Sequence, residues 1–187
     1  MWFDFLVILL LNGAFGIGKS TVAQRIRDAW PRSIVLNPEP IGVVLQRSAR
    51  LLGKRVDDFQ DLALWRRLTI VAVRLARIVR SNVIVPMAFS NAAYLDEIRL
   101  ALRRFDDTVV HVCLVAPLDV VHARLEARGA RPATHAWEYQ RAAECCAEHR
   151  RGEFAKQVRA DGDAGSVAND VLALVGEAVT CAPHATS

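Results

Sequence analysis

The stretch Gly13-Ala14-Phe15-Gly16-Ile17-Gly18-Lys19-Ser20 decides the fold. It matches the pattern GxxxxGK[ST] in full, and the unbroken apolar run before it, at 5–11, is typical of a strand buried on both faces. An amphipathic helical pattern at 19–29 follows. A glycine-rich turn between a buried strand and a helix is the setting in which this pattern cradles phosphate groups. We therefore predict a phosphate-binding loop, the P-loop, at 13–20.

The residue types in this loop indicate the phosphates of a nucleotide as its ligand. Glycines let backbone N–H groups turn inward, where a Cβ would obstruct the turn. Lys19 is expected to reach the β- and γ-phosphates, and the Ser20 hydroxyl to bind Mg²⁺. The helix that follows points its positive N-terminal end at the same anion. We expect ATP and Mg²⁺ as ligands, with nucleotide contacts from Gly13, Ala14, Phe15, Gly16, Ile17, Gly18, Lys19, Ser20 and Thr21.

The rest of the chain alternates strand and helix patterns. Short apolar runs at 33–36, 82–87 and 109–115, and a weaker one near 156–160, predict further strands. Amphipathic helical patterns lie at 41–52, 58–80, 91–104, 117–128, 133–150 and 166–179. This alternation indicates a doubly wound α/β fold, a P-loop NTPase with a mainly parallel five-stranded sheet. We expect a single nucleotide-binding domain over 1–180 and a disordered tail at 181–187.

Composition excludes several classes of protein. The 187 residues are 52% hydrophobic and 24% charged, which is too apolar for a disordered chain. No apolar run approaches the ~18–20 residues of a membrane-spanning helix. No basic residue precedes the run at 5–11, as a signal peptide would require. The four cysteines form neither a disulfide framework nor a zinc motif, so we expect a reducing compartment and a cytoplasmic protein.

The basic residues are almost all arginines. Of the 24 basic residues that give the net charge of +4, only Lys19, Lys54 and Lys156 are lysines. The planar guanidinium suits phosphate-bearing ligands, although a GC-rich coding sequence would produce the same bias. Because the arginines are interleaved with acidic residues on most predicted helices, we do not expect nucleic-acid binding.

Phosphoryl transfer needs a carboxylate near the phosphates, and Glu39 is the candidate. It follows the strand predicted at 33–36, and carboxyl ends of parallel strands face the ligand crevice. Glu39 could activate an acceptor hydroxyl or hold Mg²⁺ through water. The alternative is an acidic cap on the helix at 41–52. No Asp ends the run at 82–87, where a second metal-binding acid is usual, and this raises the importance of Glu39.

The acceptor pocket is predicted around Phe59, Gln60, Trp65 and Arg66. Phe59, Leu62 and Arg66 would lie on one face of a helix at 58–80, offering an aromatic ring and a guanidinium together. Trp65 borders that face, and its alternative role is that of a core aromatic residue.

An arginine lid is predicted at 124–132. Arg124 and Arg128 share a helix face, and Gly129 and Pro132 then end the helix. Closing lids bring arginines to the transferring phosphate and exclude water. We assign that catalytic role to Arg128 and Arg131, and interpret Arg124 as part of a solvated helix face.

Together these motifs resemble the tunicamycin-resistance ATP-binding proteins, small P-loop proteins of bacteria. The matching pieces run in order from residue 7 to about 175: Asn12-Gly13-Ala14-Phe15-Gly16, Pro38-Glu39 with Gly42, Asp58-Phe59-Gln60 with Leu64-Trp65-Arg66, Ile84-Val85-Pro86-Met87, Tyr94 with Glu97-Ile98, Arg124-Leu125 with Arg128, and Trp137, Cys145, Phe154 and Asp161. The resemblance implies binding of ATP and of the nucleoside antibiotic tunicamycin, and Met87 joins the predicted substrate contacts. Peripheral membrane contact is compatible with it, because tunicamycin carries a fatty acyl chain.

Three positions depart from the family pattern. Asn37 stands where the family has Asp, Ala88 where it has Thr, and Ala63 where it has Pro. The first two bear on ligand choice and activity. We therefore carry three hypotheses: an ATP-dependent phosphotransferase acting on tunicamycin or a similar molecule, an ATP-gated binding protein that sequesters the drug without chemistry, and an orphan small-molecule kinase. Glu39 favours the enzyme, and the missing Asp after 82–87 favours the binder.

Overall fold

A computed structural model describes residues 6–53, 58–79, 82–151 and 156–180. Its centre is a sheet of five parallel strands in the order β2-β3-β1-β4-β5. The strands are β1 (Ile8–Gly13), β2 (Ser33–Val35), β3 (Asn82–Met87), β4 (Val109–Val115) and β5 (Lys156–Arg159). β1 lies between β3 and β4, with Ile8 opposite both Val83 and Val109. The predicted α/β P-loop fold with a five-stranded parallel sheet is confirmed.

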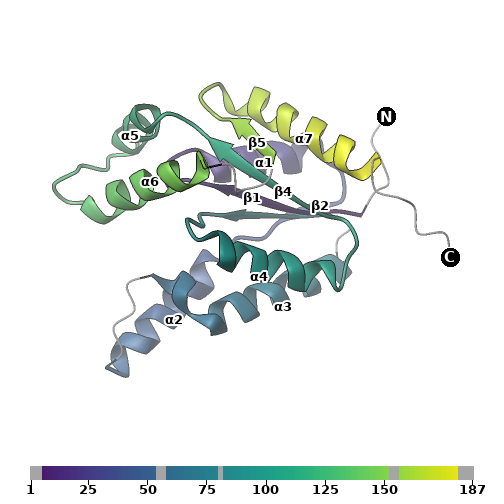
Figure 1. Cartoon of the computed structure of the whole chain (residues 1–187), viewed down its shortest axis with the longest axis horizontal. Coiled ribbons are helices and arrows are strands. Elements are labelled where there is room, and N and C mark those ends of the chain that lie inside the picture. The colour runs from purple at the N-terminus through teal and green to yellow at the C-terminus, as the bar shows by residue number, and fades with distance from the viewer. Residues whose placement is uncertain (1–5, 54–57, 80–81, 152–155, 181–187) are drawn as a thin grey trace.

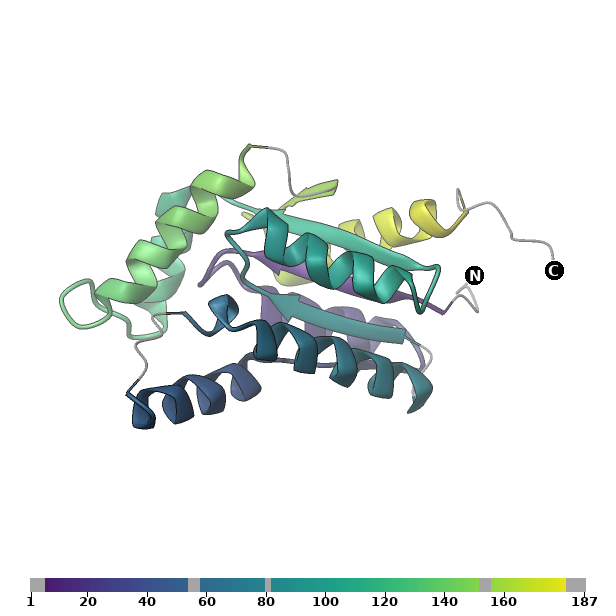
Figure 2. The same cartoon turned by 60° about the horizontal axis from the view of Figure 1, so that its bottom comes forward.

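Helices cover both faces of this sheet (Figure 1). One face carries α1 (Lys19–Ala29) and α7 (Ala164–Thr180), and the other carries α3 (Ala63–Val79) and α4 (Ala92–Arg103). α2 (Glu39–Leu51) and the short 3₁₀ helix η1 (Phe59–Asp61) contact the start of α3. α5 (Leu118–Ala127) and α6 (Ala136–His149) contact each other and lie at the carboxyl end of β4 (Figures 1 and 2).

The unbroken apolar run of β1 follows from its central place. Leu9 and Leu11 enter the core beneath α1 and α7, whereas Ile8 and Leu10 enter the core beneath α3 and α4. Because successive strand residues point to opposite faces, a strand covered on both faces has no polar alternation. The strand continues through Asn12 and Gly13, two residues beyond the apolar run.

The helix predicted at 58–80 is wrong in its first turn. The Asp58 carboxylate accepts a hydrogen bond from the Gln60 N–H at 2.9 Å, which caps the separate helix η1. Leu62 is then extended (φ −76°, ψ 109°), and α3 begins only at Ala63. Phe59, Leu62 and Arg66 therefore do not share a helix face. Instead the Phe59 ring packs on Gly42 of α2, where an added Cβ would lie 2.4 Å from the ring.

α3 packs inward through Trp65, Thr69 and Val73, all buried. Its more regular apolar residues face outward: Leu64, Leu68, Val71, Leu75 and Ile78 keep 37–74% of their surface exposed. Such a stripe ordinarily marks the buried side of a helix.

Across the residues that the structure describes, no helix has the length and apolarity needed to cross a membrane. The predicted tail at 181–187 lies outside those residues. The single domain over 1–180 stays a prediction.

Candidate functional site

The glycine loop joins β1 to α1 in a conformation that only glycines allow. Gly16 and Gly18 have φ angles of +80° and +104°. A Cβ on Gly16 would lie 2.7 Å from Leu125 of α5, and a Cβ on Gly13 would lie 3.1 Å from the side chains of Ile17 and Leu114. The loop is therefore pressed between its own turn, β4 and α5, which fixes its shape before any ligand binds.

Lys19 begins α1 at the end of this loop. Its Nζ donates to the Ala14 carbonyl at 2.8 Å and lies 5.5 Å from the centre of the Phe15 ring. Burial lowers the pKa of Lys19, the negative charge of Glu39 opposes this shift, and the positive charge of Arg128 adds to it. Glu39 and Arg128 thus lie within electrostatic reach of the same ammonium group. A buried ammonium at the head of a helix is a fitting partner for an anion.

Ser20 and Thr21 occupy the exposed side of the first turn of α1. Neither hydroxyl forms a hydrogen bond with another residue in the described part of the chain. An uncommitted hydroxyl directly after the P-loop lysine has the chemistry expected of an Mg²⁺ ligand next to a phosphate. The donor set therefore fits Mg²⁺ held together with a nucleotide.

Glu39 lies in the first turn of α2 and does not cap it. The N-cap position is Pro38, which makes no side-chain cap hydrogen bond, and the Glu39 N–H donates to the Asn37 side chain at 3.0 Å. The interpretation of Glu39 as an acidic cap is therefore wrong. Its carboxylate forms no hydrogen bond or ion pair with another described residue, so it is available to a ligand.

Trp65 holds the segment that carries Glu39. Its Nε1 donates to the Pro38 carbonyl at 3.0 Å, and its buried ring lies against Phe59 and Phe89, with ring centroids 5.0 and 5.6 Å apart. These contacts are those of a core aromatic residue, which was the alternative role predicted for Trp65. A contact between Trp65 and a substrate stays a prediction.

Gln60, Arg66 and Met87 are likewise buried. Gln60 Nε2 donates to the Ala88 carbonyl at 3.0 Å. The Arg66 guanidinium donates to the Gln60 carbonyl at 2.6 Å and to Glu97 at 2.7 Å, and it stacks on the Tyr94 ring. These contacts fix the loop after β3 and the start of α3. A substrate-binding role for the three residues stays a prediction.

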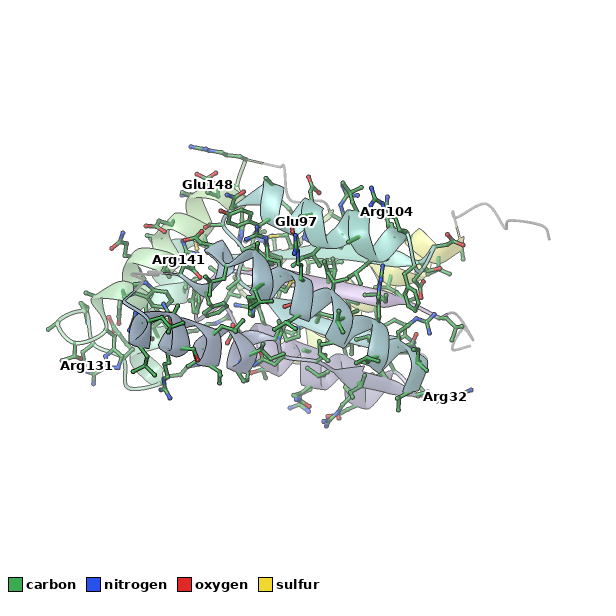
Figure 3. All side chains as sticks on the ribbon, turned by 90° about the horizontal axis from the view of Figure 1, so that it is seen from below. Arg32, Glu97, Arg104, Arg131, Arg141 and Glu148 are labelled. Carbon is green, nitrogen blue, oxygen red and sulfur yellow. The ribbon has the colours of Figure 1, made fainter. Side chains whose placement is uncertain are left out.

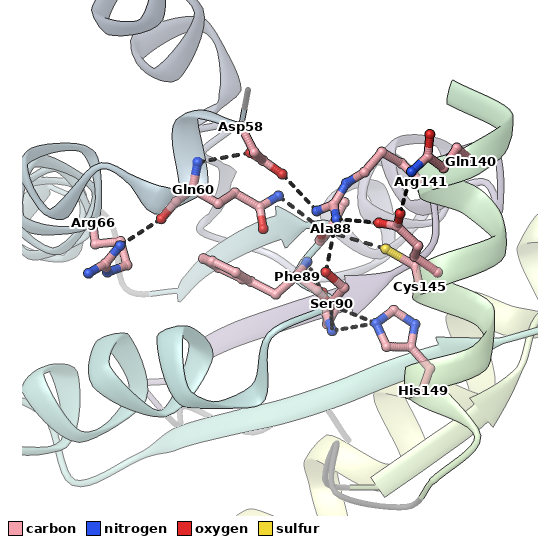
Figure 4. Close-up of polar contacts among 12 residues, drawn as sticks. Asp58, Gln60, Arg66, Ala88, Phe89, Ser90, Gln140, Arg141, Cys145 and His149 are labelled. Atoms are coloured by element: carbon pink, nitrogen blue, oxygen red, sulfur yellow. Dashed lines mark hydrogen bonds and ion pairs between the residues drawn. The ribbon is translucent and has the colours of Figure 1, made fainter. Parts of the chain in front are cut away.

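Sequence reasoning missed an ion pair between α6 and η1 (Figure 4). Arg141 Nη2 lies 2.7 Å from an Asp58 oxygen, and Arg141 Nη1 lies 2.8 Å from Glu144 and donates to Ser90 Oγ at 3.1 Å. Burial raises the pKa of Asp58, while the Gln60 N–H and Arg141 oppose that shift. The family motif includes Asp58, but no pattern in the sequence around Arg141 indicates that this arginine pairs with Asp58.

A second missed network starts at Asn12, at the end of β1. Its side chain donates to the Phe89 carbonyl at 3.1 Å and accepts from the Phe89 N–H at 2.8 Å. Nε2 of His149, on α6, lies 2.6 Å from the same carbonyl (Figure 4). One buried amide therefore connects the strand before the P-loop, the loop after β3 and α6. The sign of this network in the sequence was Asn12, the first residue of the family motif Asn12-Gly13-Ala14-Phe15-Gly16.

Arg124 is not part of a solvated face, and that interpretation is wrong. Its guanidinium donates to three carbonyls: Ile17 in the P-loop at 2.7 Å, Ala160 at 2.6 Å and Gly162 at 3.1 Å. It thereby ties α5 to the P-loop and to the segment between β5 and α7. A guanidinium can bridge these carbonyls because its donors form a rigid planar fork.

The two arginines assigned to the lid have different surroundings. Arg128 is the C-cap of α5 and is exposed, and its guanidinium forms no hydrogen bond or ion pair with another described residue. Arg131 lies at the outer edge of the molecule (Figure 3) and donates to the Glu126 and Ala130 carbonyls at 3.3 and 3.2 Å. The structure thus brings Arg128, but not Arg131, to the neighbourhood of Lys19. The start of α6 reaches the P-loop through Trp137, whose ring centroid lies 5.3 Å from that of Phe15.

A cavity of about 330 Å³ adjoins the P-loop. Gly18, Thr21, Arg124, Arg128, Gly162 and Val167 are among its lining residues. It therefore lies between the start of α1, the end of α5 and the segment leading into α7. This size falls at the lower end of the range for small-molecule sites.

The parallel sheet, the glycine loop with its buried lysine and the helices beyond the carboxyl end of β4 define a P-loop protein of kinase-like fold. The chain belongs to the AAA domain family, whose model matches residues 8–144. No curated protein matches the chain.

Solved structures agree with this assignment. The tunicamycin resistance protein of Deinococcus radiodurans is 27% identical, with a TM-score of 0.72 over 91% of this chain and 96% of that one. A gluconokinase from Sinorhizobium meliloti 1021 is 19% identical, with a TM-score of 0.67 over 92% and 93%. Shikimate kinase from Acinetobacter baumannii, in complex with shikimate, is 16% identical, with a TM-score of 0.60 over 94% and 96%. The predicted resemblance to tunicamycin-resistance proteins is confirmed, and the two kinases share the fold.

Proposed function

We propose that this protein binds ATP and Mg²⁺ at the P-loop and transfers the γ-phosphoryl group to a hydroxyl of a small molecule, tunicamycin or a similar nucleoside antibiotic. One observation carries the proposal: Glu39 and Arg128 come from different elements, yet both act electrostatically on the buried Lys19. A base, a phosphate-binding cation and a second cation around one point are the groups that phosphoryl transfer requires.

The nucleotide half of the site follows from the loop and the cavity. The phosphates would lie on the loop N–H groups and on Lys19, which would exchange its bond to the Ala14 carbonyl for phosphate oxygens. The adenine ring of the nucleotide would enter the 330 Å³ cavity beside Arg124 and Gly162. Mg²⁺ bound together with ATP would neutralise part of the phosphate charge, and the Ser20 hydroxyl would hold the metal ion.

Glu39 would act as the general base. Its carboxylate is free of hydrogen bonds and ion pairs within the described chain, and its backbone is fixed by Asn37 and, through Pro38, by Trp65. It would accept the proton of the acceptor hydroxyl as the oxygen attacks the γ-phosphorus. Arg128, which also has an uncommitted side chain, would approach the γ-phosphoryl oxygens as charge moves onto the leaving ADP.

We propose tunicamycin or a similar molecule as the phosphoryl acceptor because of the likeness to the Deinococcus radiodurans protein. The Deinococcus protein with 27% identity is described as a tunicamycin resistance protein. This chain has the family motif pieces Pro38-Glu39, Asp58-Phe59-Gln60 and Leu64-Trp65-Arg66, although Asn37 and Ala63 beside them depart from the family pattern. Ala88, the departure from the family Thr, turns its carbonyl toward Gln60, so the lost hydroxyl does not remove that contact.

Sequestration without chemistry is the second candidate. The segment after β3, Ala88-Phe89-Ser90, brings no carboxylate to the phosphates, so Mg²⁺ would have fewer protein ligands than in a complete kinase site. An ATP-gated binder needs the loop and the cavity but not the base.

Mass spectrometry of tunicamycin after incubation with protein and Mg·ATP separates the two candidates. The enzyme predicts a product heavier by one phosphoryl group. In Glu39→Gln, which keeps the shape but loses the basicity, product formation should fall by ~10²–10⁴ while tunicamycin affinity changes little. The control Asp170→Asn removes an exposed carboxylate of α7, on the face of the sheet opposite α3 and α4, and should match the wild type. Tight binding of tunicamycin with no phosphorylated product would favour the binder.

A further inference from the structure

The outer face of α3 is an apolar ridge without a covering element in the described structure. Its exposed residues, the α3 ridge, are Leu64 (56%), Leu68 (37%), Val71 (49%), Leu75 (60%), Ile78 (74%) and Val79 (79%). Large exposed apolar patches on globular proteins mark interaction sites. Figure 2 shows α3 running along the outside of the helical layer, with α4 beside it.

The charges of α3 are turned away from this ridge. Arg66 pairs with Glu97, Arg77 pairs with Asp106, and Arg74 donates to the Ala101 carbonyl, so these three arginines engage α4 or the segment after it. Arg67 is exposed, and α3 contains no acidic residue. Exposed residues of α3 are therefore apolar but for one arginine.

The spacing of the ridge is that of a helix-packing seam. Leu64, Leu68, Val71, Leu75 and Ile78 follow one another at intervals of four, three, four and three residues, the repeat that places side chains along a single line of contact. The line is also nearly symmetric about Val71, with apolar residues three or four and seven positions away on either side. A two-fold axis near Val71 would lay the ridge of one copy on the ridge of another, running in opposite directions.

We propose that the α3 ridge is a homodimer interface in which α3 of one copy packs antiparallel against α3 of a second copy, with the two-fold axis near Val71. The exposed fractions amount to roughly 600 Å² of ridge surface per copy, close to the ~800 Å² per partner of a standard interface. Phe105, which lies under the Arg74 guanidinium and is 45% exposed, extends the surface at one side.

A second copy suits this surface better than a lipid layer does. Helices that lie on membranes carry basic residues along both borders of a broad apolar face and favour aromatic residues at its edge. α3 has one exposed arginine, Arg67, and so lacks basic residues along both borders of the ridge. The aromatic residue beside the ridge, Phe105, is covered on one side by the Arg74 guanidinium. The narrow, regular line of branched side chains on the ridge matches another helix.

The interface would also steady the acceptor half of the proposed site, although the proposal does not depend on that function. Trp65, in the first turn of α3, holds the Pro38 carbonyl next to Glu39. Packing α3 between the sheet and a second copy would therefore fix the element that anchors Glu39 from both sides.

Sedimentation velocity of the full chain over 1–100 μM tests the state of assembly. We expect a wild-type dimer. Val71→Glu places two charges at the axis and should give a monomer that keeps the wild-type helix content and still unfolds cooperatively, because the side chain is exposed in a single copy. Its melting temperature should fall only by the stabilisation that the dimer supplies. Ala173→Glu, on the exposed face of α7 behind the sheet, should stay dimeric. A wild-type monomer across this range, or a Val71→Glu dimer, would overturn the proposal.

Crosslinking with a short bismaleimide tests the geometry. Val71→Cys should give a covalent dimer, because position 71 of one copy lies next to position 71 of the second copy at the two-fold axis. The Ala173→Cys variant and the wild type, which keeps the native cysteines, give the background level of crosslinking. Leu64→Cys should stay near background, since position 64 lies at the opposite end of the partner helix; efficient crosslinking there would mean parallel packing and refute the antiparallel arrangement. A monomer that binds vesicles of anionic phospholipid through Val71 would assign the ridge to a lipid surface instead.

Discussion

Replacing Arg124 by Gln tests whether this side chain is a structural clamp on the nucleotide loop. The guanidinium donates to the Ile17, Ala160 and Gly162 carbonyls at 2.7, 2.6 and 3.1 Å, and Gln cannot span all three. Hydrogen bonds from a charged donor contribute ~1.5–3 kcal/mol each at buried sites, but Arg124 is only part-buried, so water will replace some of them. We expect the free energy of unfolding to fall by about 2–3 kcal/mol in total. For a chain of this size that lowers the melting temperature by roughly 4–12 °C.

The assay is thermal and urea unfolding of the nucleotide-free protein, followed by calorimetric titration of ATP. Affinity for ATP should also weaken, since the Ile17 carbonyl belongs to the P-loop. Arg131→Gln is the matched control: its exposed guanidinium donates only to the Glu126 and Ala130 carbonyls at 3.3 and 3.2 Å, so the loss should stay within ~0.5 kcal/mol. An equal loss of unfolding free energy in the two variants would refute the clamp and would mean that Arg124 behaves as a residue of a solvated helix face.

Three further substitutions test other parts of the site. Lys19→Ala removes the buried charge while the glycine loop stays, so ATP affinity should fall at least tenfold, about 1.4 kcal/mol, in calorimetric titration; unchanged affinity would contradict the P-loop assignment. Arg128→Lys keeps the charge but loses the fork, so phosphoryl transfer should drop strongly while ADP affinity barely moves, and equal losses for ADP and a non-hydrolysable ATP analogue would place Arg128 elsewhere. Gly42→Ala inserts a Cβ 2.4 Å from the Phe59 ring, which should cost about 1–3 kcal/mol by overpacking; a melting temperature equal to the wild type would show that the ring moves freely.

The parts of the fold that sequence could predict are those encoded locally. The P-loop combines a buried strand, positive-φ glycines and a helix start within one short stretch, and each of these leaves its own signal. The start of η1 as a separate helix also had a local cause, the Asp58 side chain that accepts a hydrogen bond from the Gln60 N–H, but the longer helical periodicity hid it. Competing local signals of this kind make element boundaries hard to place.

Contacts between distant elements left no such signal. Arg141 on α6 meets Asp58 on η1, and Arg124 on α5 meets the P-loop, yet in the sequence each is one arginine among many. Periodicity likewise shows that α3 has an apolar side but not which side the sheet will cover. The inner side holds Trp65, Thr69 and Val73, and the more regular stripe remained outside.

The edge-to-face contact between Phe15 and Trp137 gives the molecule a built-in optical reporter. Trp30 and Trp65 are 6% and 2% exposed, so their emission should be blue-shifted and insensitive to solvent, whereas Trp137 is 45% exposed and touches the residue that Lys19 overlies. Nucleotide binding that moves Lys19 from the Ala14 carbonyl to a phosphate would change the surroundings of the Trp137 indole, because Lys19 lies over the Phe15 ring that Trp137 touches. In a Trp2→Phe variant, which removes the tryptophan outside the described residues, long-wavelength emission and its quenching by iodide would then report on the loop in real time, with no added dye.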